Sequence, residues 1–134
     1  MQRVLIVDDE ENTRIGLGKL LTGHGYHVVA ACNGLVALKC LEQEPIDLVI
    51  TDINMPEMNG LIFLRTLNSA YPQVKVIMIT AYGGVESYLE AMNLGAFEYL
   101  NKPVKLEELK AVIAKIFSAC SHSTTQLKGP AAAP

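Results

Sequence analysis

Five polar residues follow apolar, strand-like runs of this sequence, and their side chains are of the kinds that bind metal ions and handle charged groups. Asp8 and Asp9 follow the run 4–7, Asp52 follows 48–50 after one threonine, Thr80 follows 76–79, and Lys102 follows 97–100 after one asparagine. If the runs are parallel strands, all five residues lie along the carboxyl edge of one sheet, where open α/β sheets bind ligands. We therefore expect Asp8, Asp9 and Asp52 to converge from distant parts of the chain.

Three carboxylates at one place need a cation, because each disfavours the charged form of the others. Carboxylate oxygens with few other protein ligands suit Mg²⁺, with Mn²⁺ as an alternative, and Mg²⁺ also takes phosphate oxygens. Lys102 is placed to reach the same carboxylates from the side. A metal ion, a lysine and the Thr80 hydroxyl around one carboxylate suit phosphoryl transfer, in which the cations offset charge and the carboxylate attacks in line.

The segments that hold these residues alternate between strand-like runs and helical patterns. Most of the runs are apolar throughout, as expected for strands covered on both faces. Between them, apolar residues recur at helical spacing; the second helix is expected over Gly34–Gln43, before Pro45. The pattern predicts an α/β, flavodoxin-like (βα)5 domain with a doubly wound parallel sheet in the order 2-1-3-4-5. The five runs are 4–7, 28–31, 48–50, 76–79 and 97–100.

Composition limits the alternatives. The chain has 134 residues, a formal charge of −3 and 50% hydrophobic residues, which is typical of a globular domain and gives no electrostatic reason for nucleic-acid binding. We expect no signal peptide and no membrane helix, and therefore a cytoplasmic protein. The three cysteines lack the spacing of a zinc site or a disulfide framework. We expect one domain over residues 1–118, and a tail or interdomain linker over 119–134, where helical periodicity fades.

Two further acids, Glu10 and Glu11, follow Asp8 and Asp9. Both are interpreted as first-turn acids that interact favourably with the dipole of the helix that begins there. One helix start does not explain Asp52, which ends a different strand. We assign no chemistry to the cysteines or histidines.

Four motifs give the chain a family resemblance. They are VDDE at Val7–Glu10, TDINMPEMNG at Thr51–Gly60, ITAY at Ile79–Tyr82, and GAFEYLNKP at Gly95–Pro103. In this order and on these strand ends they resemble the receiver domain of two-component response regulators, across Arg3–Phe117. The last motif is similar to receivers of NtrC-type regulators, which precede an ATPase domain in transcription activators.

The resemblance implies a role for each residue of the acidic edge. Asp52 would be the phosphoacceptor, which takes its phosphoryl group from a histidine kinase or phosphotransfer protein. Asp9, Asp52 and the backbone carbonyl of Asn54 would bind Mg²⁺ directly, and Asp8 would bind it through a water molecule. Lys102 would pair with the phosphoryl group.

Other positions are implied to shape or read the site. The Thr80 hydroxyl would move to the phosphoryl group while Tyr99 swings inward, changing the face made by the fourth helix, the fifth strand and the fifth helix. Homodimerisation through that face is a further expectation. Asn54 and Tyr82 would set phosphoryl lifetime. The Lys102–Pro103 peptide would be cis, and Pro56 and Gly60 would shape the loop after the third strand.

Two other functions remain as alternatives. A phosphatase of the haloacid dehalogenase type uses similar groups but carries its DxD motif after the first strand, and a pseudo-receiver would be a scaffold without phosphorylation. The expected function is therefore a phosphorylation-activated switch, and an enzyme only in catalysing its own phosphorylation and dephosphorylation. Whether an ATPase or DNA-binding domain follows Pro134 is left open.

Overall fold

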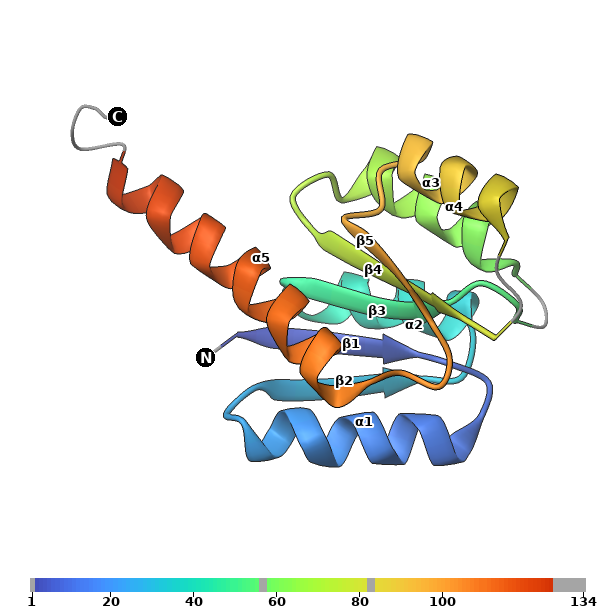
Figure 1. Ribbon diagram of the computed structural model, residues 1–134, viewed down its shortest axis with the longest axis horizontal. Coiled ribbons are helices and arrows are strands. Elements are labelled where there is room, and N and C mark those ends of the chain that lie inside the picture. Colours follow the sequence, from blue (N-terminus) through green and yellow to red (C-terminus); the bar gives the residue numbers. More distant parts are fainter. Residues whose placement is uncertain (1, 56–57, 82–83, 127–134) are drawn as a thin grey trace. The chain divides into compact units, whose positions relative to one another are not determined.

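The computed structural model describes residues 2–55, 58–81 and 84–126 (Figure 1). The chain forms two compact units, Met1–Lys102 and Pro103–Pro134. The first unit alternates strands and helices, as the sequence predicts. Its strands are β1 (Arg3–Val7), β2 (His27–Ala31), β3 (Leu48–Asp52), β4 (Lys75–Thr80) and β5 (Glu98–Asn101), and its helices are α1 (Glu11–Gly23), α2 (Gly34–Gln43), α3 (Gly60–Ala70) and α4 (Val85–Asn93).

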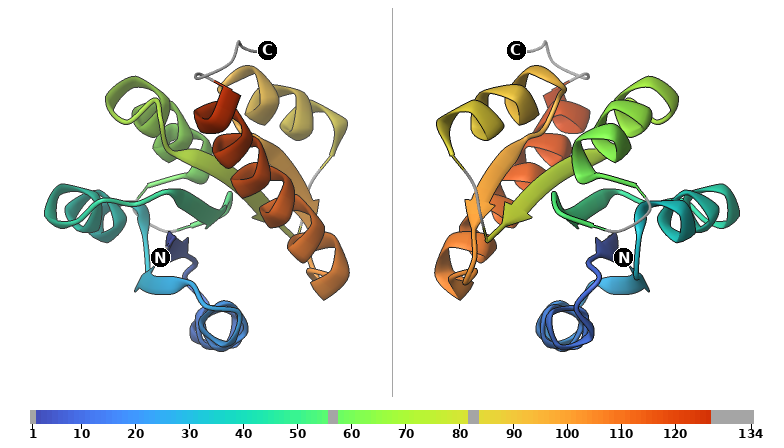
Figure 2. Two further views of the ribbon diagram at one scale, coloured as in Figure 1. Left: turned by 90° about the vertical axis from the view of Figure 1, so that its left-hand side faces the viewer. Right: turned by 90° about the vertical axis from the view of Figure 1, so that its right-hand side faces the viewer.

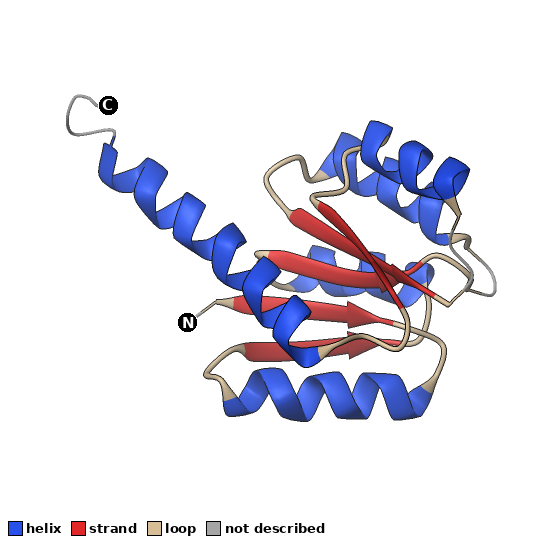
Figure 3. Cartoon of the chain, viewed as in Figure 1, coloured by secondary structure: helices blue, strands red, loops and turns tan. Residues whose placement is uncertain are grey.

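The five strands form one parallel sheet in the order β2-β1-β3-β4-β5, which confirms the predicted fold (Figure 3). Their carboxyl ends therefore lie along one edge, with β1 and β3 as neighbours. The register places Val7 beside Thr51, Asp52 beside Ile79, and Thr80 beside Asn101. The residues that follow β1, end β3 and end β4 are thus brought to adjacent positions at this edge.

Strands β1, β3 and β4 are buried along most of their length, which is why they read as apolar runs. Alternate residues point to opposite faces, and on one face Leu5, Val49 and Met78 belong to one hydrophobic cluster with Phe63 and Leu67 of α3. Helices α2, α3 and α4 lie on that side of the sheet, and α1 lies on the other (Figure 2). A tightly packed sheet gives the polar edge a rigid base.

Local features position the loops at the polar edge. Asn33 and Asn59 cap α2 and α3 by accepting hydrogen bonds from Val36 N and Leu61 N at 2.8 and 2.7 Å. Gly60 N donates to Ile53 O at 2.7 Å, and a Cβ on Gly60 would lie 2.6 Å from Ile53 Cα. Only glycine fits so close to the backbone that follows β3, so Gly60 holds the start of α3 against the acidic edge.

The second unit contains helix α5 (Leu106–Gln126), whose first turn carries Glu107 and Glu108. The helix continues eight residues past Ser118, so the first part of the expected tail is helical. The division into a domain over 1–118 and a linker over 119–134 stays a prediction.

Candidate functional site

The structure brings Asp8, Asp9 and Asp52 together at the carboxyl edge of the sheet. One carboxylate oxygen from each lies within 4.8 Å of the others. Asp8 and Asp52 are 0% and 5% exposed, whereas Asp9 is exposed. Asp8 and Asp9 come from the end of β1, and Asp52 is the last residue of β3, so their proximity depends on the pairing of these two strands.

Lys102 is the cation of the cluster. Its Nζ lies 2.9 Å from Asp52 Oδ2, 3.0 Å from Asp8 Oδ2 and 3.1 Å from Glu10 Oε1. Its side chain is only 15% exposed, and its backbone N–H donates to Thr80 O at 2.8 Å, which fixes the residue beside the end of β4. A lysine at this position balances part of the negative charge of four acids.

The two ends of the Asp8–Lys102 ion pair have perturbed pKa values. Burial raises the pKa of the Asp8 carboxyl, and a hydrogen bond from Glu10 N and the nearby Lys102 ammonium only partly oppose this. Burial by itself would lower the pKa of Lys102, but its contacts with Asp52, Asp8 and Glu10 outweigh burial and raise the pKa above its usual value. Lys102 is therefore a permanent positive charge at physiological pH.

Asn54 and Thr80 lie next to Asp52. The Asn54 backbone N–H donates to Asp52 Oδ1 at 3.1 Å, and the Asn54 side-chain Nδ2 donates to Thr80 Oγ1 at 3.4 Å. Thr80 is fully buried. Because Asn54 contacts both Asp52 and Thr80, the Thr80 hydroxyl lies at the same edge as the carboxylates. Asn54 thus links the loop after β3 to the end of β4.

Tyr99 on β5 lies behind this edge. It is 9% exposed, and its ring meets the ring of Tyr88 on α4 edge-on, with centroids 5.6 Å apart. Its hydroxyl oxygen is buried and accepts or donates no hydrogen bond among the described residues. Tyr99 is thus already packed inward against α4.

Some of the residues expected to shape the site keep their roles as predictions. Pro56 and Tyr82 lie outside the described residues. The cis form of the Lys102–Pro103 peptide stays a prediction. Gly60 lies against the backbone of Ile53, as described above. The roles of Asn54 and Tyr82 in phosphoryl lifetime stay predictions.

Glu10 is a contact of the site that the sequence did not reveal. The sequence alone indicates a first-turn charge for Glu10, the third of four consecutive acids, but its carboxylate accepts a hydrogen bond from Lys102, ninety-two residues away. The helix begins at Glu11, and Glu10 occupies the N-cap position without a side-chain cap. The only hint in the sequence is that Glu10 lies two residues after Asp8. That spacing does not show whether Glu10 or Glu11 would reach the site.

The acid cluster fits a hard divalent cation. Asp8 Oδ2 is buried and accepts no hydrogen bond from the described residues; its 3.0 Å contact with Lys102 is an ion pair only. Asp8 Oδ2 and the nearby oxygens of Asp9 and Asp52 therefore have lone pairs that could bind a cation. Carboxylate oxygens grouped in this way are the ligands that Mg²⁺ prefers.

Comparison with known proteins assigns the family. A family model described as the response regulator receiver domain matches residues 4–114. This chain belongs to that family. The receiver is thus a signalling module of the two-component response regulators, as its motifs predicted, and neither the phosphatase nor the pseudo-receiver alternative is favoured.

Three similar proteins illustrate the range of the family. The receiver is 38% identical to the transcriptional regulatory protein ZraR of Escherichia coli (strain K12) over 90% of this chain and 27% of ZraR. It is 34% identical to sporulation initiation phosphotransferase F of Bacillus subtilis (strain 168), over 85% of this chain and 92% of that protein. The solution structure of the beryllofluoride-activated NtrC4 receiver domain dimer matches with a TM-score of 0.84 and 33% identity, covering 89% of this chain and 98% of the other.

The receiver therefore spans about a quarter of the length of ZraR but nearly the whole of the Bacillus protein. The chain thus matches part of a longer transcriptional regulatory protein and nearly the whole of a sporulation initiation phosphotransferase. Among the residues that the structure describes, no helix has the length and apolar character needed to cross a membrane.

Proposed function

We propose that Asp52 of this receiver is the phosphoacceptor of a two-component phosphorelay. The observation that carries the proposal is the position of its buried carboxylate, with Oδ2 2.9 Å from the Lys102 ammonium and Oδ1 held by Asn54 N. These contacts orient the carboxylate and hold a positive charge beside it, which supports a role for Lys102 in binding phosphoryl oxygens. Such pre-positioned charge is the main contribution of a protein to phosphoryl transfer.

The step is a displacement at phosphorus. A carboxylate oxygen of Asp52 forms a bond to the phosphorus atom while the bond from phosphorus to the donor histidine nitrogen breaks. The electron pair of that bond stays on the imidazole. Lys102 would stabilise charge on the phosphoryl oxygens, and the Thr80 hydroxyl, which accepts from Asn54 Nδ2, would donate its own hydrogen to a phosphoryl oxygen.

Asp9, Asp52 and the Asn54 carbonyl would hold Mg²⁺, and Asp8 would do so through water. When bound, Mg²⁺ offsets the negative charge of the acids and of the phosphoryl oxygens. Asp8 is the least exposed of the acids and already contacts both Lys102 and Glu10 N, which suits an indirect role. Mn²⁺ satisfies the same donors.

Phosphorylation would be read through α4 and β5. The buried Tyr99, its edge-on contact with Tyr88 and its nearness to the end of β4 support a coupled rearrangement of Thr80 and Tyr99. The partners would be a histidine kinase or phosphotransfer protein in the cytoplasm, and a second receiver on the face that includes α4 and β5. The beryllofluoride-activated dimer of the NtrC4 receiver supports the last point.

The receiver would act as a switch that modifies only itself. Residues 119–134 would connect it to an output domain, as the partial coverage of ZraR suggests, or would end a single-domain regulator like the Bacillus protein. Reading the gene beyond Pro134 decides between these two.

The test is an intact-mass measurement after incubation with acetyl phosphate and Mg²⁺. We expect the mass of one phosphoryl group on the wild type and none on Asp52→Asn. Asp47→Asn is the matched control, because Asp47 precedes β3 at the opposite edge and binds Arg3 N. Modification that persists in Asp52→Asn would refute the assignment.

A further inference from the structure

The Lys102 ammonium has a carboxylate neighbour for each of its donors. An ammonium group carries three N–H donors. Oxygens of Asp52, Asp8 and Glu10 lie 2.9, 3.0 and 3.1 Å from Nζ. Nζ donates hydrogen bonds to Asp52 Oδ2 and Glu10 Oε1, and Asp8 Oδ2 is an ion-pair neighbour, so an incoming phosphoryl oxygen competes with these carboxylates for the ammonium.

The three carboxylates differ in how well water can replace the lysine. The side chains of Asp8 and Asp52 are 0% and 7% exposed, whereas that of Glu10 is 64% exposed. A buried carboxylate that loses its cation is strongly destabilised. An exposed ion pair contributes little, because water solvates the freed charge. Asp52 would itself carry the phosphoryl group, so the comparison is between Asp8 and Glu10, and Glu10 is the one that Lys102 releases more readily.

Glu10 is also held so that it faces Lys102. Its backbone N–H donates to Asp8 Oδ1 at 2.9 Å, and Thr13 Oγ1 donates to its carboxylate at 3.4 Å. Glu10 occupies the N-cap of α1, where short side chains such as those of Asn33 and Asn59 are favoured, yet it makes no cap hydrogen bond. Its carboxylate accepts a hydrogen bond from Lys102 and does not cap the helix.

We propose that Glu10 is a positioning residue that occupies one N–H of Lys102 until a phosphoryl oxygen displaces it. This inference rests on the proposed function, because it takes Asp52 as the acceptor. Glu10 keeps the ammonium oriented in the unphosphorylated receiver and competes with the phosphoryl group for it. Removing the Glu10 carboxylate therefore shifts the equilibrium toward the phosphoryl-bound state.

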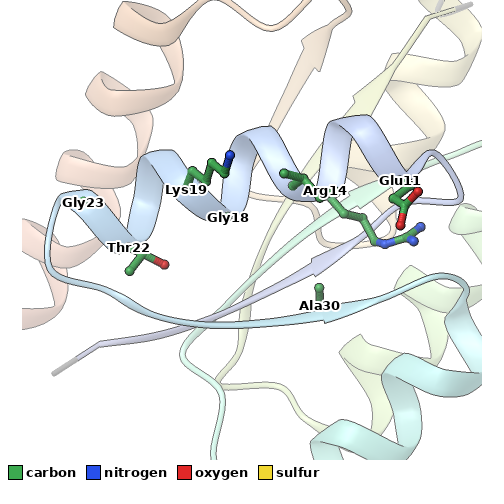
Figure 4. A pocket seen from close by; sticks show the side chains of 8 residues that line it. Glu11, Arg14, Gly18, Lys19, Thr22, Gly23 and Ala30 are labelled. Atoms are coloured by element: carbon green, nitrogen blue, oxygen red, sulfur yellow. The ribbon is translucent and has the colours of Figure 1, made fainter.

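The measurement is a titration of the receiver with beryllofluoride, a phosphoryl analogue, at fixed Mg²⁺ and followed by NMR. Glu10→Gln is expected to bind beryllofluoride about twofold to fivefold more tightly than the wild type, the range in which exposed ion pairs contribute. The matched control is Glu11→Gln, which removes the same charge one residue later. Glu11 lines the hollow between α1 and β2, together with Arg14 (Figure 4).

A second variant separates contact from charge. Glu10→Asp keeps the negative charge at the helix start but withdraws the carboxylate by one methylene, and Lys102 cannot follow because two buried acids hold it. If the contact matters, Glu10→Asp also binds beryllofluoride more tightly than the wild type. A role in the helix dipole alone predicts wild-type affinity for Glu10→Asp.

The outcomes distinguish this inference from the proposed function. Equal gains in affinity for Glu10→Gln and Glu11→Gln would show a general charge effect and overturn the inference, while leaving Asp52 as acceptor. Wild-type affinity in Glu10→Asp would overturn it as well. A wild-type receiver that neither binds beryllofluoride nor accepts a phosphoryl group would refute the proposed function, and the inference with it.

Discussion

The crowded acids at the sheet edge predict that Asp8→Asn stabilises the receiver in the absence of divalent cations. Carboxylate oxygens of Asp8, Asp9 and Asp52 lie within 4.8 Å of one another. At that separation two unit charges repel by about 3.5 kcal/mol at an effective dielectric constant of about 20. Asp8 has two such neighbours.

The attraction of Lys102 offsets most of this repulsion. At 3.0 Å the same relation gives about 5.5 kcal/mol for the Asp8–Lys102 pair. Burial of Asp8 adds a further cost for its charged form, as the raised pKa of this carboxyl indicates. We therefore expect a small net gain for Asp8→Asn, about 1 kcal/mol in the free energy of unfolding, because Lys102 keeps Asp52 and Glu10 as partners.

The pH dependence has a defined sign. A carboxyl whose pKa is raised in the folded state destabilises that state when it is ionised. The cost is present at neutral pH and disappears as pH falls toward and below 3.8, the usual pKa of an aspartate side chain. The advantage of Asp8→Asn over the wild type should therefore be largest near neutral pH and vanish in acid.

The assay is urea unfolding followed by circular dichroism, in EDTA and in Mg²⁺. At ten times its dissociation constant, Mg²⁺ stabilises the wild type by about 1.4 kcal/mol, and Asp8→Asn should gain clearly less. Glu11→Gln is the control: it removes an exposed first-turn acid, should lose about 0.3–1 kcal/mol, and should keep the full Mg²⁺ effect. The reasoning fails if Asp8→Asn in EDTA is less stable than the wild type, or if Mg²⁺ stabilises it as strongly.

Three further predictions follow from packing and burial. Gly60→Ala should lower the free energy of unfolding by roughly 2 kcal/mol or more in the same assay, because its Cβ would overlap the backbone at Ile53; a change below the error of the measurement would contradict the close approach. Tyr99→Phe should leave the melting temperature unchanged or raise it, since the buried hydroxyl has no partner among the described residues, and a clear loss would reveal one. Burial and nearby Glu44 raise the pKa of Cys40, so iodoacetamide at pH 8 should alkylate Cys40 more slowly than exposed Cys32, as measured by peptide mass spectrometry; equal rates would contradict the burial of Cys40.

Much of the fold could be predicted from the sequence because its signals are local. Apolar runs, helical spacing and breakers such as Pro45 depend only on neighbouring residues, and α2 begins and ends where they indicate. The alternation of strands and helices indicates a doubly wound parallel sheet, and the predicted order 2-1-3-4-5 is the one that the structure has. The convergence of Asp8, Asp9 and Asp52 needed only that order, because parallel strands end at one edge.

The tertiary structure decided which side chains within that edge touch. Glu10 and Glu11 are equivalent by residue type and neighbourhood, yet Glu10 contacts Lys102 because the N-cap turn directs it there. The contact of Asn54 with Thr80 depends on the pairing of β3 with β4. These contacts join residues that are far apart in sequence, so their geometry is set by register, loop path and burial rather than by residue type.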